Sequence, residues 1–445
     1  MDLIRQVLLL IMKTKGIKTV NVITLGCSKN LVDSESLMKQ LTANGYRVVH
    51  DSNQPAEIVI VNTCGFINDA KQESIETVLQ FEDLRKSNKI EKLFVFGCLS
   101  ERYKKELETE IPLVDKYFGV YNLKELVESI GAHYKEELVG ERQLTTPKHY
   151  AYLKISEGCD RTCSFCAIPL IKGKHTSRPI NYVVKEAQFL VSNGVKEIIL
   201  IAQDLSYYGM DIYKKFALAE LIDKLSGVKG LKWLRLHYTF PAKFPMDVID
   251  VMKAKSNICK YLDIPVQHIS NKLLKSMRRG ITKEQTYELI DHFRKEIPGM
   301  ALRTTLLVGH PGETDEDFNE LIEFVKYAKF ERLGVFTYSE EENTYSAIHY
   351  KDDIPFSIKQ ARMNEIMDVQ REISNELNTN KIGKVFKVIV DRKEGGYYVG
   401  RTEYDSPEVD NEVIIKPGKK RLKPGSFYEV KITSADDFDL TGEIN

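Results

Sequence analysis

Three cysteines lie within one short segment, Gly158 to Cys166, with the spacing Cys-x3-Cys-x2-Cys. They are Cys159, Cys163 and Cys166. Thiolates at this spacing can point inward from one tight loop and ligate a single metal centre. A closed zinc site uses four protein ligands, and an ordinary [4Fe–4S] cluster uses four cysteines. Because this loop supplies three, one metal position is left open to a ligand that is not cysteine.

A zinc knuckle that borrows a distant fourth ligand is the alternative. The loop contains no histidine, and the next one, His175, follows Pro169, so the pattern favours iron–sulfur. The spacing resembles the signature of the radical S-adenosylmethionine (SAM) enzymes. In that superfamily three such cysteines hold a [4Fe–4S] cluster, and SAM chelates the fourth iron. Phe165, an aromatic residue before the third cysteine, also fits the signature and is assigned to the cofactor site.

A second set of cysteines, Cys27, Cys64 and Cys98, is spread along the first hundred residues. Each follows a run of residues typical of a β-strand, and these strands are predicted at 18–23, 57–62 and 92–96. Three unrelated buried thiols are the alternative, because free cysteine is often buried. However, each of these cysteines is predicted to lie in a loop beside a glycine, at the sheet edge where ligands bind. The sequence therefore favours a second three-thiolate iron–sulfur site.

The predicted strands of residues 18–130 alternate with helices, including one at 31–43, and a fourth strand is expected at 117–120. Such alternation is typical of a parallel sheet covered by helices. A polar connector at 131–149 follows and predicts the first domain boundary.

A second alternation begins at Tyr150. Its strands are predicted at 151–155, 197–202, 233–236, 261–264, 301–307 and 333–336. Six βα units suggest a partial barrel with its site at the carboxyl ends of the strands. Polar residues gather there, namely Gln203-Asp204, His237-Tyr238, Gln267-His268, Arg303 and the turn 309–313. By residue type, Gln203, Asp204 and Arg303 suit the amino, carboxylate and ribose groups of SAM.

A long charged helix is predicted at 358–380, as a spacer to a last domain. Five short strands follow, at 385–390, 397–401, 412–415, 427–432 and 439–443, separated by Gly and Pro turns. They predict a small antiparallel β-barrel of a type that often binds nucleic acid. From Lys381 onward this domain has 12 basic and 12 acidic residues. It carries an acidic run (Glu403, Asp405, Glu408, Asp410 and Glu412) and a basic run between Lys416 and Lys423.

The whole chain has 445 residues and balanced charge, with 64 basic and 64 acidic residues. Its length predicts two or three domains, and its balance gives no overall attraction to nucleic acid. Seven cysteines, six of them in the two predicted metal sites, indicate a reducing cytoplasm. The apolar run at 7–12 is too short to cross a membrane, and residues 1–17 are predicted to be a disordered leader.

Taken together, the segments resemble the methylthiotransferases of the radical SAM superfamily. The motifs are Leu-Gly-Cys-Ser-Lys-Asn at Cys27, Asn-Thr-Cys-Gly-Phe at Cys64, Phe-Gly-Cys-Leu at Cys98, and Ile-Ser-Glu-Gly-Cys at Cys159. The resemblance implies an α/β protein with a cluster-binding N-terminal domain at 18–135, a radical SAM core at 145–375 and a TRAM barrel at 381–445. It also implies two [4Fe–4S] clusters, one on each cysteine set, and SAM as cofactor.

Within that family, the segments 303–314 and 400–410 resemble the branch that modifies an aspartate of a small-subunit ribosomal protein. The tRNA-modifying branch typically has Phe where this chain has His310. A tRNA methylthiotransferase is therefore the alternative, and a non-catalytic iron–sulfur protein that binds RNA is a third reading. The third is disfavoured because a structural cluster gains nothing from open coordination positions.

The resemblance implies hydrogen abstraction from the β-carbon of the aspartate by a SAM-derived radical, followed by sulfur insertion from the second cluster. A flavodoxin- or ferredoxin-like electron donor is expected, and no sulfur donor is identified. No membrane association is expected. The acidic run of the last domain predicts a face that attracts a basic ribosomal protein. RNA binding by the basic run is the less favoured reading.

Overall fold

The computed structural model describes residues 17–418 and 421–444. The chain forms two compact units, of which the first ends at Thr145 and the second begins at Thr146. The predicted leader lies outside the described residues except for Ile17. Within the described ranges no helix combines the length and apolarity needed to cross a membrane.

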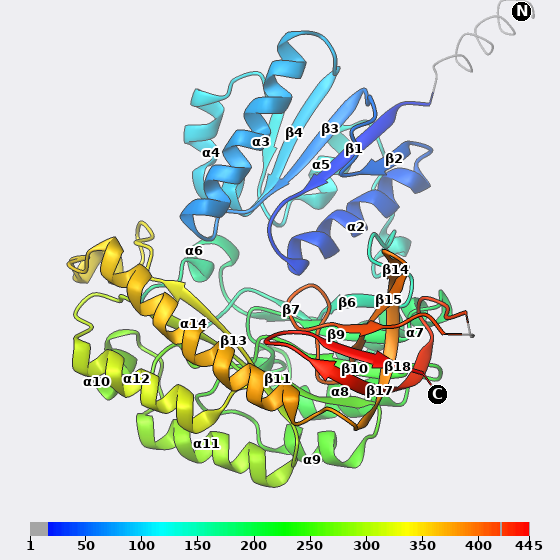
Figure 1. Cartoon of the computed structure of the whole chain (residues 1–445). Coiled ribbons are helices and arrows are strands. Elements are labelled where there is room, and N and C mark those ends of the chain that lie inside the picture. Colours follow the sequence, from blue (N-terminus) through cyan, green and yellow to red (C-terminus); the bar gives the residue numbers. More distant parts are fainter. Residues whose placement is uncertain (1–16, 419–420, 445) are drawn as a thin grey trace, which may run out of the picture. The chain divides into compact units, whose positions relative to one another are not determined.

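The first unit is a five-stranded parallel sheet with the order β2-β1-β3-β4-β5 (Figure 1). Its elements are β1 (Thr19–Thr24), α2 (Ser28–Ala43), β2 (Arg47–His50), β3 (Ile58–Thr63), α3 (Asn68–Lys86), β4 (Lys92–Gly97), α4 (Cys98–Glu110), β5 (Lys116–Phe118) and α5 (Leu123–Ser129). The sequence prediction missed β2, a four-residue edge strand that is only partly buried. Edge strands of this kind carry a weak hydrophobic pattern because one side remains in water.

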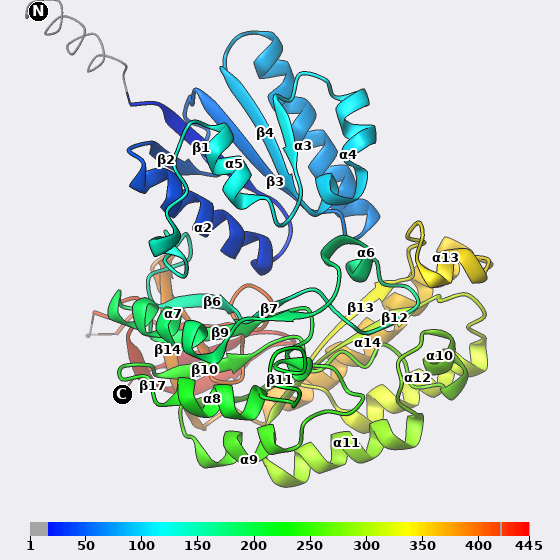
Figure 2. The same ribbon diagram turned by 180° about the vertical axis from the view of Figure 1, so that it is seen from behind.

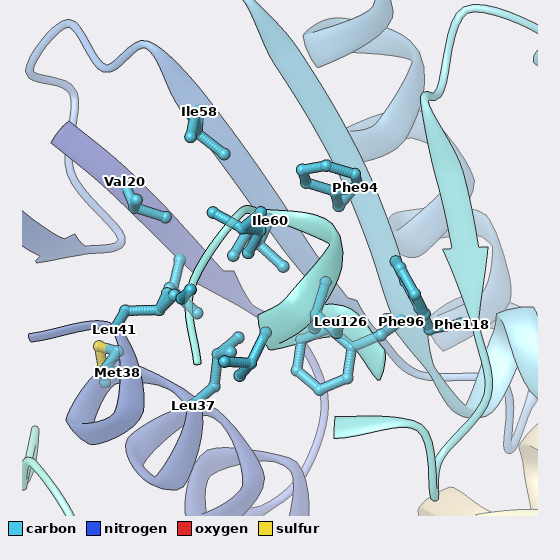
Figure 3. Close-up of a cluster of buried hydrophobic side chains, with 14 residues drawn as sticks. Val20, Leu37, Met38, Leu41, Ile58, Ile60, Phe94, Phe96, Phe118 and Leu126 are labelled. Atoms are coloured by element: carbon cyan, nitrogen blue, oxygen red, sulfur yellow. The ribbon is translucent and has the colours of Figure 1, made fainter. Parts of the chain in front are cut away.

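Both faces of this sheet are buried, as expected for a parallel sheet between helices. On one face, Ile58, Ile60 and Phe94 pack against Leu37 of α2 and Leu126 of α5 (Figure 3). On the other face, alternate strand residues pack against α3 and α4; they are Val59, Val61 and Val95. These two layers fix the carboxyl ends of β1, β3 and β4, and Cys27, Cys64 and Cys98 follow these ends.

The second unit contains a six-stranded, all-parallel partial barrel with the order β13-β12-β11-β10-β9-β6. Its strands are β6 (Tyr150–Lys154), β9 (Glu197–Ile201), β10 (Trp233–Leu236), β11 (Ile258–Asp263), β12 (Ala301–Val308) and β13 (Arg332–Thr337). Its helices are α6 (Ile168–Lys172), α7 (Ile180–Ser192), α8 (Leu218–Ser226), α9 (Asp247–Ala254), α10 (Asn271–Ser276), α11 (Lys283–Glu296), α12 (Asp315–Ala328), α13 (Tyr345–His349) and α14 (Phe356–Thr379). All six predicted strands are present, and Figure 2 shows helices α7, α8, α9 and α11 along the outside of the sheet.

A closed five-stranded barrel with the order β14-β15-β16-β18-β17 completes the second unit. Its strands are β14 (Val385–Glu394), β15 (Tyr397–Thr402), β16 (Val413–Ile415), β17 (Phe427–Ala435) and β18 (Leu440–Glu443). The expectation of a purely antiparallel barrel is wrong in one respect, because β16 and β18 pair in parallel. On its other edge, β18 pairs antiparallel with β17, the strand that precedes it in the chain.

The prediction that α14 is a spacer is wrong. Ile366 and Ile373 of α14 are buried, and Gln370 Nε2 donates to the carbonyl of Phe330, which precedes β13. At the other end of the helix, Asn378 Nδ2 donates to the carbonyls of Asp436 and Phe438 in the small barrel. The helix therefore ties the partial barrel and the small barrel into one unit, because its polar side chains bond to both.

The prediction that the acidic run forms an outer face is wrong for Asp405 and Asp410. Asp405 is buried against Arg332 of β13, and Asp410 lies 3.3 Å from Arg303 of β12. Glu408 accepts hydrogen bonds from two phenol groups of β6, those of Tyr150 and Tyr152. Asp405 and Asp410 therefore join the two barrels instead of facing a partner, whereas Glu408 bonds to the partial barrel and remains exposed.

A continuous buried ion network strengthens the same junction. Glu197 of β9 lies 2.8 Å from Arg235 of β10 and 2.9 Å from Arg401 of β15. Arg401 also pairs with Asp391 at 2.7 Å, and Asp391 lies 2.7 Å from His149 Nε2. A charge buried without a partner strongly destabilises the folded state. Loss of one residue of this network would therefore leave a neighbouring charge buried and unpaired.

Candidate iron–sulfur and SAM sites

The loop with Cys159, Cys163 and Cys166 lies between the short strand β7 (Ser156–Glu157) and α6. Gly158 opens it with φ +76°, and a Cβ there would come within 2.1 Å of the Lys174 carbonyl, so only glycine fits. The Cys159 amide donates to the Gly173 carbonyl at 3.1 Å, and the Cys166 amide donates to the Cys163 carbonyl at 3.2 Å. Backbone bonds therefore hold the three thiols in a closed turn.

The thiols of this loop are buried or half-buried. Burial raises the pKa of both Cys159 and Cys166 to about 12. Thiolates bind metals, so Cys159 and Cys166 require a cationic centre to lose their protons. The Arg279 Nη1 group donates to Cys163 Sγ at 3.2 Å, and the Arg161 amide donates to Cys159 Sγ at 3.4 Å. Both contacts favour the thiolate form over the thiol.

Two guanidinium groups flank the ring of Phe240 beside this loop. The Cζ atoms of Arg161 and Arg279 lie 4.3 and 4.2 Å from the ring centroid. Arg161 Nε donates to Asp204 Oδ2 at 2.7 Å, which fixes its plane. Among the residues that the structure describes, Arg161 Nη2 and Arg279 Nε are buried and bond to nothing. These two donors fit a bound anionic group such as a carboxylate.

Sequence reasoning did not find Arg279 or Phe240. Arg279 is separated from Cys163 by 116 positions, and no spacing rule connects the two. Arg161 lies between Cys159 and Cys163, and this position was the one sequence signal that could have identified it as a site residue. The barrel strands bring these groups together, so tertiary structure alone identifies them.

The residues predicted to contact SAM differ in how many of their polar atoms already bond to other groups of the protein. Gln203 Nε2 donates to Glu157, while Gln203 Oε1 is buried without a partner in the described part of the chain. Asp204 accepts from the Ser206 amide at 2.8 Å and from Arg161, so it orients Arg161. Phe165 packs against an apolar cluster formed by Leu273, Met277, Leu307 and Tyr338.

Arg303, the fourth predicted contact, already has two carboxylate partners. It lies 3.4 Å from Asp263 and 3.3 Å from Asp410. Both carboxylates are buried, and they hold the guanidinium against the strand ends. Arg303 therefore has less free capacity for a ligand than Arg161 or Arg279.

The other predicted rim residues serve the protein itself. His237 Nε2 lies 2.8 Å from Ser406 Oγ of the small barrel, and His268 Nδ1 accepts from the Ser270 amide. In the turn 309–313, burial raises the pKa of Glu313 to about 7, and this carboxyl accepts from the Gly309 amide. Cys259, the seventh cysteine, is buried in β11 in an apolar cluster that includes Ile389 of the small barrel.

In the first unit, the other three cysteines occur at corresponding places. Cys27 is the N-cap of α2, Cys64 follows β3, and Cys98 is the first residue of α4. The expectation that Cys98 lies in a loop is therefore wrong, because the helix begins at once after β4. A helix N-terminus stabilises a thiolate, since its amide groups and dipole favour negative charge.

Glycines beside these cysteines let the three connections touch. A Cβ on Gly26 would lie 2.9 Å from Cys64 Sγ, one on Gly65 would lie 2.8 Å from Leu99 Cα, and one on Gly97 would lie 2.5 Å from the Thr63 carbonyl. The three turns thus pack directly against one another at the carboxyl edge of the sheet.

Asn30 of α2 links the same three turns by hydrogen bonds. Its Nδ2 donates to the carbonyls of Leu25 and Thr63 at 2.9 and 3.1 Å, and Cys98 Sγ lies 3.8 Å from its Oδ1. Burial raises the pKa of Cys64, to which the nearby Cys27 contributes. Asn30 thus bonds to residues of the turns that carry the three cysteines.

Neither set has the geometry of a mononuclear site. Across 17–418 and 421–444, no three Cys, His, Asp or Glu side chains converge on one ion position. An iron–sulfur cluster attaches each cysteine to a different iron, so its thiols surround a volume and do not meet at a point. Three soft thiol donors per site are compatible with such a cluster.

Comparison with known proteins supports this division of the chain. Residues 19–119 match the family described as "Uncharacterized protein family UPF0004", residues 153–325 match the radical SAM superfamily, and residues 382–444 match the TRAM domain. The three matches cover the cysteine-bearing sheet, the partial barrel and the small barrel.

Relatives of known name match nearly the full length. The chain is 59% identical over 427 residues to the ribosomal protein uS12 methylthiotransferase RimO of Phocaeicola vulgatus, covering 96% of this chain and 99% of the relative. It is also 59% identical over 434 residues to the protein of that name from Christiangramia forsetii, covering 97% and 96%.

A solved structure supports the fold. The radical SAM methyltransferase TsrM of Kitasatospora setae has a TM-score of 0.55 and 16% identity, covering 74% of this chain and 77% of that one. Likeness at this identity concerns the fold alone. Sequence identity over almost the entire length decides the family: the chain belongs to the RimO family of methylthiotransferases within the radical SAM superfamily.

Proposed function

We propose that this protein is a radical SAM methylthiotransferase that adds a methylthio group to the β-carbon of an aspartate in ribosomal protein uS12. The observation that carries this proposal is the three-cysteine loop with unused arginine donors beside it. It occurs in a chain 59% identical to uS12 methylthiotransferases over nearly its full length.

Two [4Fe–4S] clusters and SAM are the cofactors. Cys159, Cys163 and Cys166 are proposed to hold the cluster that binds SAM, and Cys27, Cys64 and Cys98 the second. When bound, the first cluster and SAM supply a 5′-deoxyadenosyl radical that abstracts hydrogen from the substrate. The cluster on the second cysteine set is proposed to present the sulfur atom that is transferred to the substrate.

The side chains around the first cysteine loop position SAM. Arg161 and Arg279 offer donors for the methionine carboxylate, and Gln203 Oε1 offers an acceptor for the amino group. Phe165 covers the loop from the apolar side and excludes water. Asp204 holds Arg161 in place. Arg303 remains in the proposal as a group at the strand ends, held by Asp263.

The proposal includes partners and a location. Ribosomal protein uS12 is the substrate, and an electron donor of the flavodoxin or ferredoxin kind reduces the first cluster. A cytoplasmic location fits a modifier of ribosomal proteins and the six cysteines assigned to clusters, which need a reducing compartment.

Anaerobic reaction of the reconstituted protein with SAM, a reductant, sulfide and purified uS12 tests the proposal. Mass spectrometry of uS12 peptides should show one added methylthio group on a single aspartate. A parallel reaction with bulk tRNA should show none. Methylthiolated adenosine in tRNA with unmodified uS12 would transfer the assignment to the tRNA branch.

A further inference from the structure

A surface segment attached to the first cysteine loop combines acidic and exposed apolar side chains. Residues 339–358, here named the α13 segment, lead from the end of β13 through α13 to the start of α14. The segment has five acidic residues and one basic residue, namely Glu340, Glu341, Glu342, Asp352 and Asp353 against Lys351. Glu341 is buried and Asp352 pairs with Lys359 of α14, so the local excess at the surface comes from Glu340, Glu342 and Asp353.

The α13 segment is bonded directly to the cysteine loop. The Ser346 amide donates to the Ser164 carbonyl at 2.7 Å, and Ser164 lies between Cys163 and Cys166. His310 Nε2 lies 3.0 Å from Ser346 Oγ and 3.5 Å from Ser164 Oγ. A phenylalanine at position 310 could make neither polar contact. The segment is thus attached to Ser164, which is adjacent to Cys163 and two residues before Cys166.

Its outer side exposes large apolar groups. Ile348 is 66% exposed and Phe356 is 71% exposed. Tyr345 is also exposed and is held between the His349 ring, at a centroid distance of 3.8 Å, and the Arg278 guanidinium, at 4.6 Å. Both views show α13 at the margin of the second unit, outside the strands (Figures 1 and 2). These three exposed apolar residues fall within positions 345–356, and an exposed apolar surface often marks a binding site.

We infer that the α13 segment is the docking surface for a basic stretch of the ribosomal protein substrate, an inference that rests on the proposed function. The substrate must reach the cysteine loop, and this segment is an exposed surface bonded to it. Ribosomal proteins are basic because they bind RNA, and Glu340 and Glu342 offer the complementary charge. Ile348 offers apolar contact beside them.

Charge reversal in the double variant E340K/E342K tests the electrostatic part. The KM for uS12 should rise about tenfold at low salt with little change in kcat, because encounter and docking depend on complementary charge. The increase should shrink at high salt, since salt screens exposed charges. The Kd of the iron-free protein for uS12, measured by equilibrium binding, should rise in parallel.

The matched control is E288K/E323K, which makes the same charge change on exposed positions of α11 and α12. It should leave KM and Kd close to those of the parent protein. SAM cleavage without substrate and the cluster absorption spectrum check that both variants are folded. I348D tests the apolar part and should raise KM equally at low and high salt.

Two failures are distinguishable. If the parent protein modifies uS12 but E340K/E342K changes KM and Kd no more than the control does, the docking inference is overturned and the function stands. If the parent protein does not modify uS12 at all, the proposed function fails and the docking inference fails with it.

Discussion

Individual residues around the first cysteine loop set the charge that its ligands experience. Arg279 donates to Cys163 Sγ, and Arg161 lies across the ring of Phe240 with Asp204 fixing its direction. Two positive charges next to three thiolates offset part of the negative charge of a bound cluster. The same charges stabilise its reduced form, because reduction adds an electron.

Changing all three cysteines of one set separates the two clusters. The anaerobically reconstituted parent protein should hold about eight irons, from two four-iron clusters. The variant C159A/C163A/C166A should keep about four and lose SAM cleavage. The variant C27A/C64A/C98A should also keep about four, but should still cleave SAM to 5′-deoxyadenosine. Iron analysis and chromatography of the products check both, and full iron retention in the first variant would contradict the cluster assignment.

Replacing Arg279 by Ala should lower the reduction potential of the first cluster, because a positive charge and an N–H···S bond are removed. Arg279→Lys should recover part of the potential, as it restores the charge without the planar fork. A redox titration followed by electron paramagnetic resonance measures it, on a background of C27A/C64A/C98A that leaves one cluster. Lys275→Ala, on exposed α10, is the control. A potential that stays equal in all variants would remove Arg279 from the site.

At the level of elements, the segment between β15 and β16 joins the two barrels. Its acidic side chains meet cations or hydroxyls of β6, β12 and β13, as Asp405 does with Arg332. Glu412, at the end of the same run, instead pairs with Arg392 at the surface. One run of similar residues therefore contains both buried and exposed ion pairs.

Asp405→Asn should destabilise the second unit by about 3 kcal/mol, because it leaves Arg332 buried without its counter-charge. Glu412→Gln, a chemically equivalent change at the exposed pair, should cost less than about 1 kcal/mol. Denaturant unfolding of the iron-free proteins gives both values. Equal losses in the two variants would show that the Arg332–Asp405 pair is not the source of the stability.

The same pairs predict how stability changes with pH. Although burial opposes ionisation, Arg332 and Lys381 keep the pKa of Asp405 below its usual value of 3.8. A carboxyl with a lowered folded-state pKa stabilises the protein above the unfolded pKa, and loses this contribution as pH falls through the folded value. The difference in melting temperature between the parent protein and Asp405→Asn should thus be constant from neutral pH to about 5 and shrink below about 4. A difference that grew on acidification would contradict this sign.

On the scale of the whole molecule, the second unit includes both barrels, although each barrel matches a different protein family. Arg235 is fully buried and donates to the Glu403 carbonyl of the small barrel at 2.7 Å. Trp233 packs edge-on against Phe427 at a centroid distance of 4.8 Å. The small barrel therefore completes the core of the partial barrel.

Deletion of residues 381–445 should consequently give an insoluble or unfolded chain. The deletion removes Asp405 and Asp410, the counter-charges of the buried Arg332 and of Arg303, and it uncovers Trp233 and Cys259. Soluble expression and circular dichroism of the truncated chain check this. A soluble truncated chain with native helix content would show that the small barrel is an independent module.

Local features of the sequence were enough to predict the cysteine chemistry and the order of the elements. Cysteine spacing, glycine neighbours and strand periodicity are local properties, and they predicted the parallel sheet, the partial barrel and the closed small barrel. The sequence could not predict partners distant in the chain, such as Arg279 for Cys163 or Arg332 for Asp405. Such pairs form only when strands and loops separated by tens of residues meet. For that reason the sequence suggested an acidic outer face, whereas the tertiary structure buries Asp405 and Asp410 between the barrels, where each carboxylate meets an arginine.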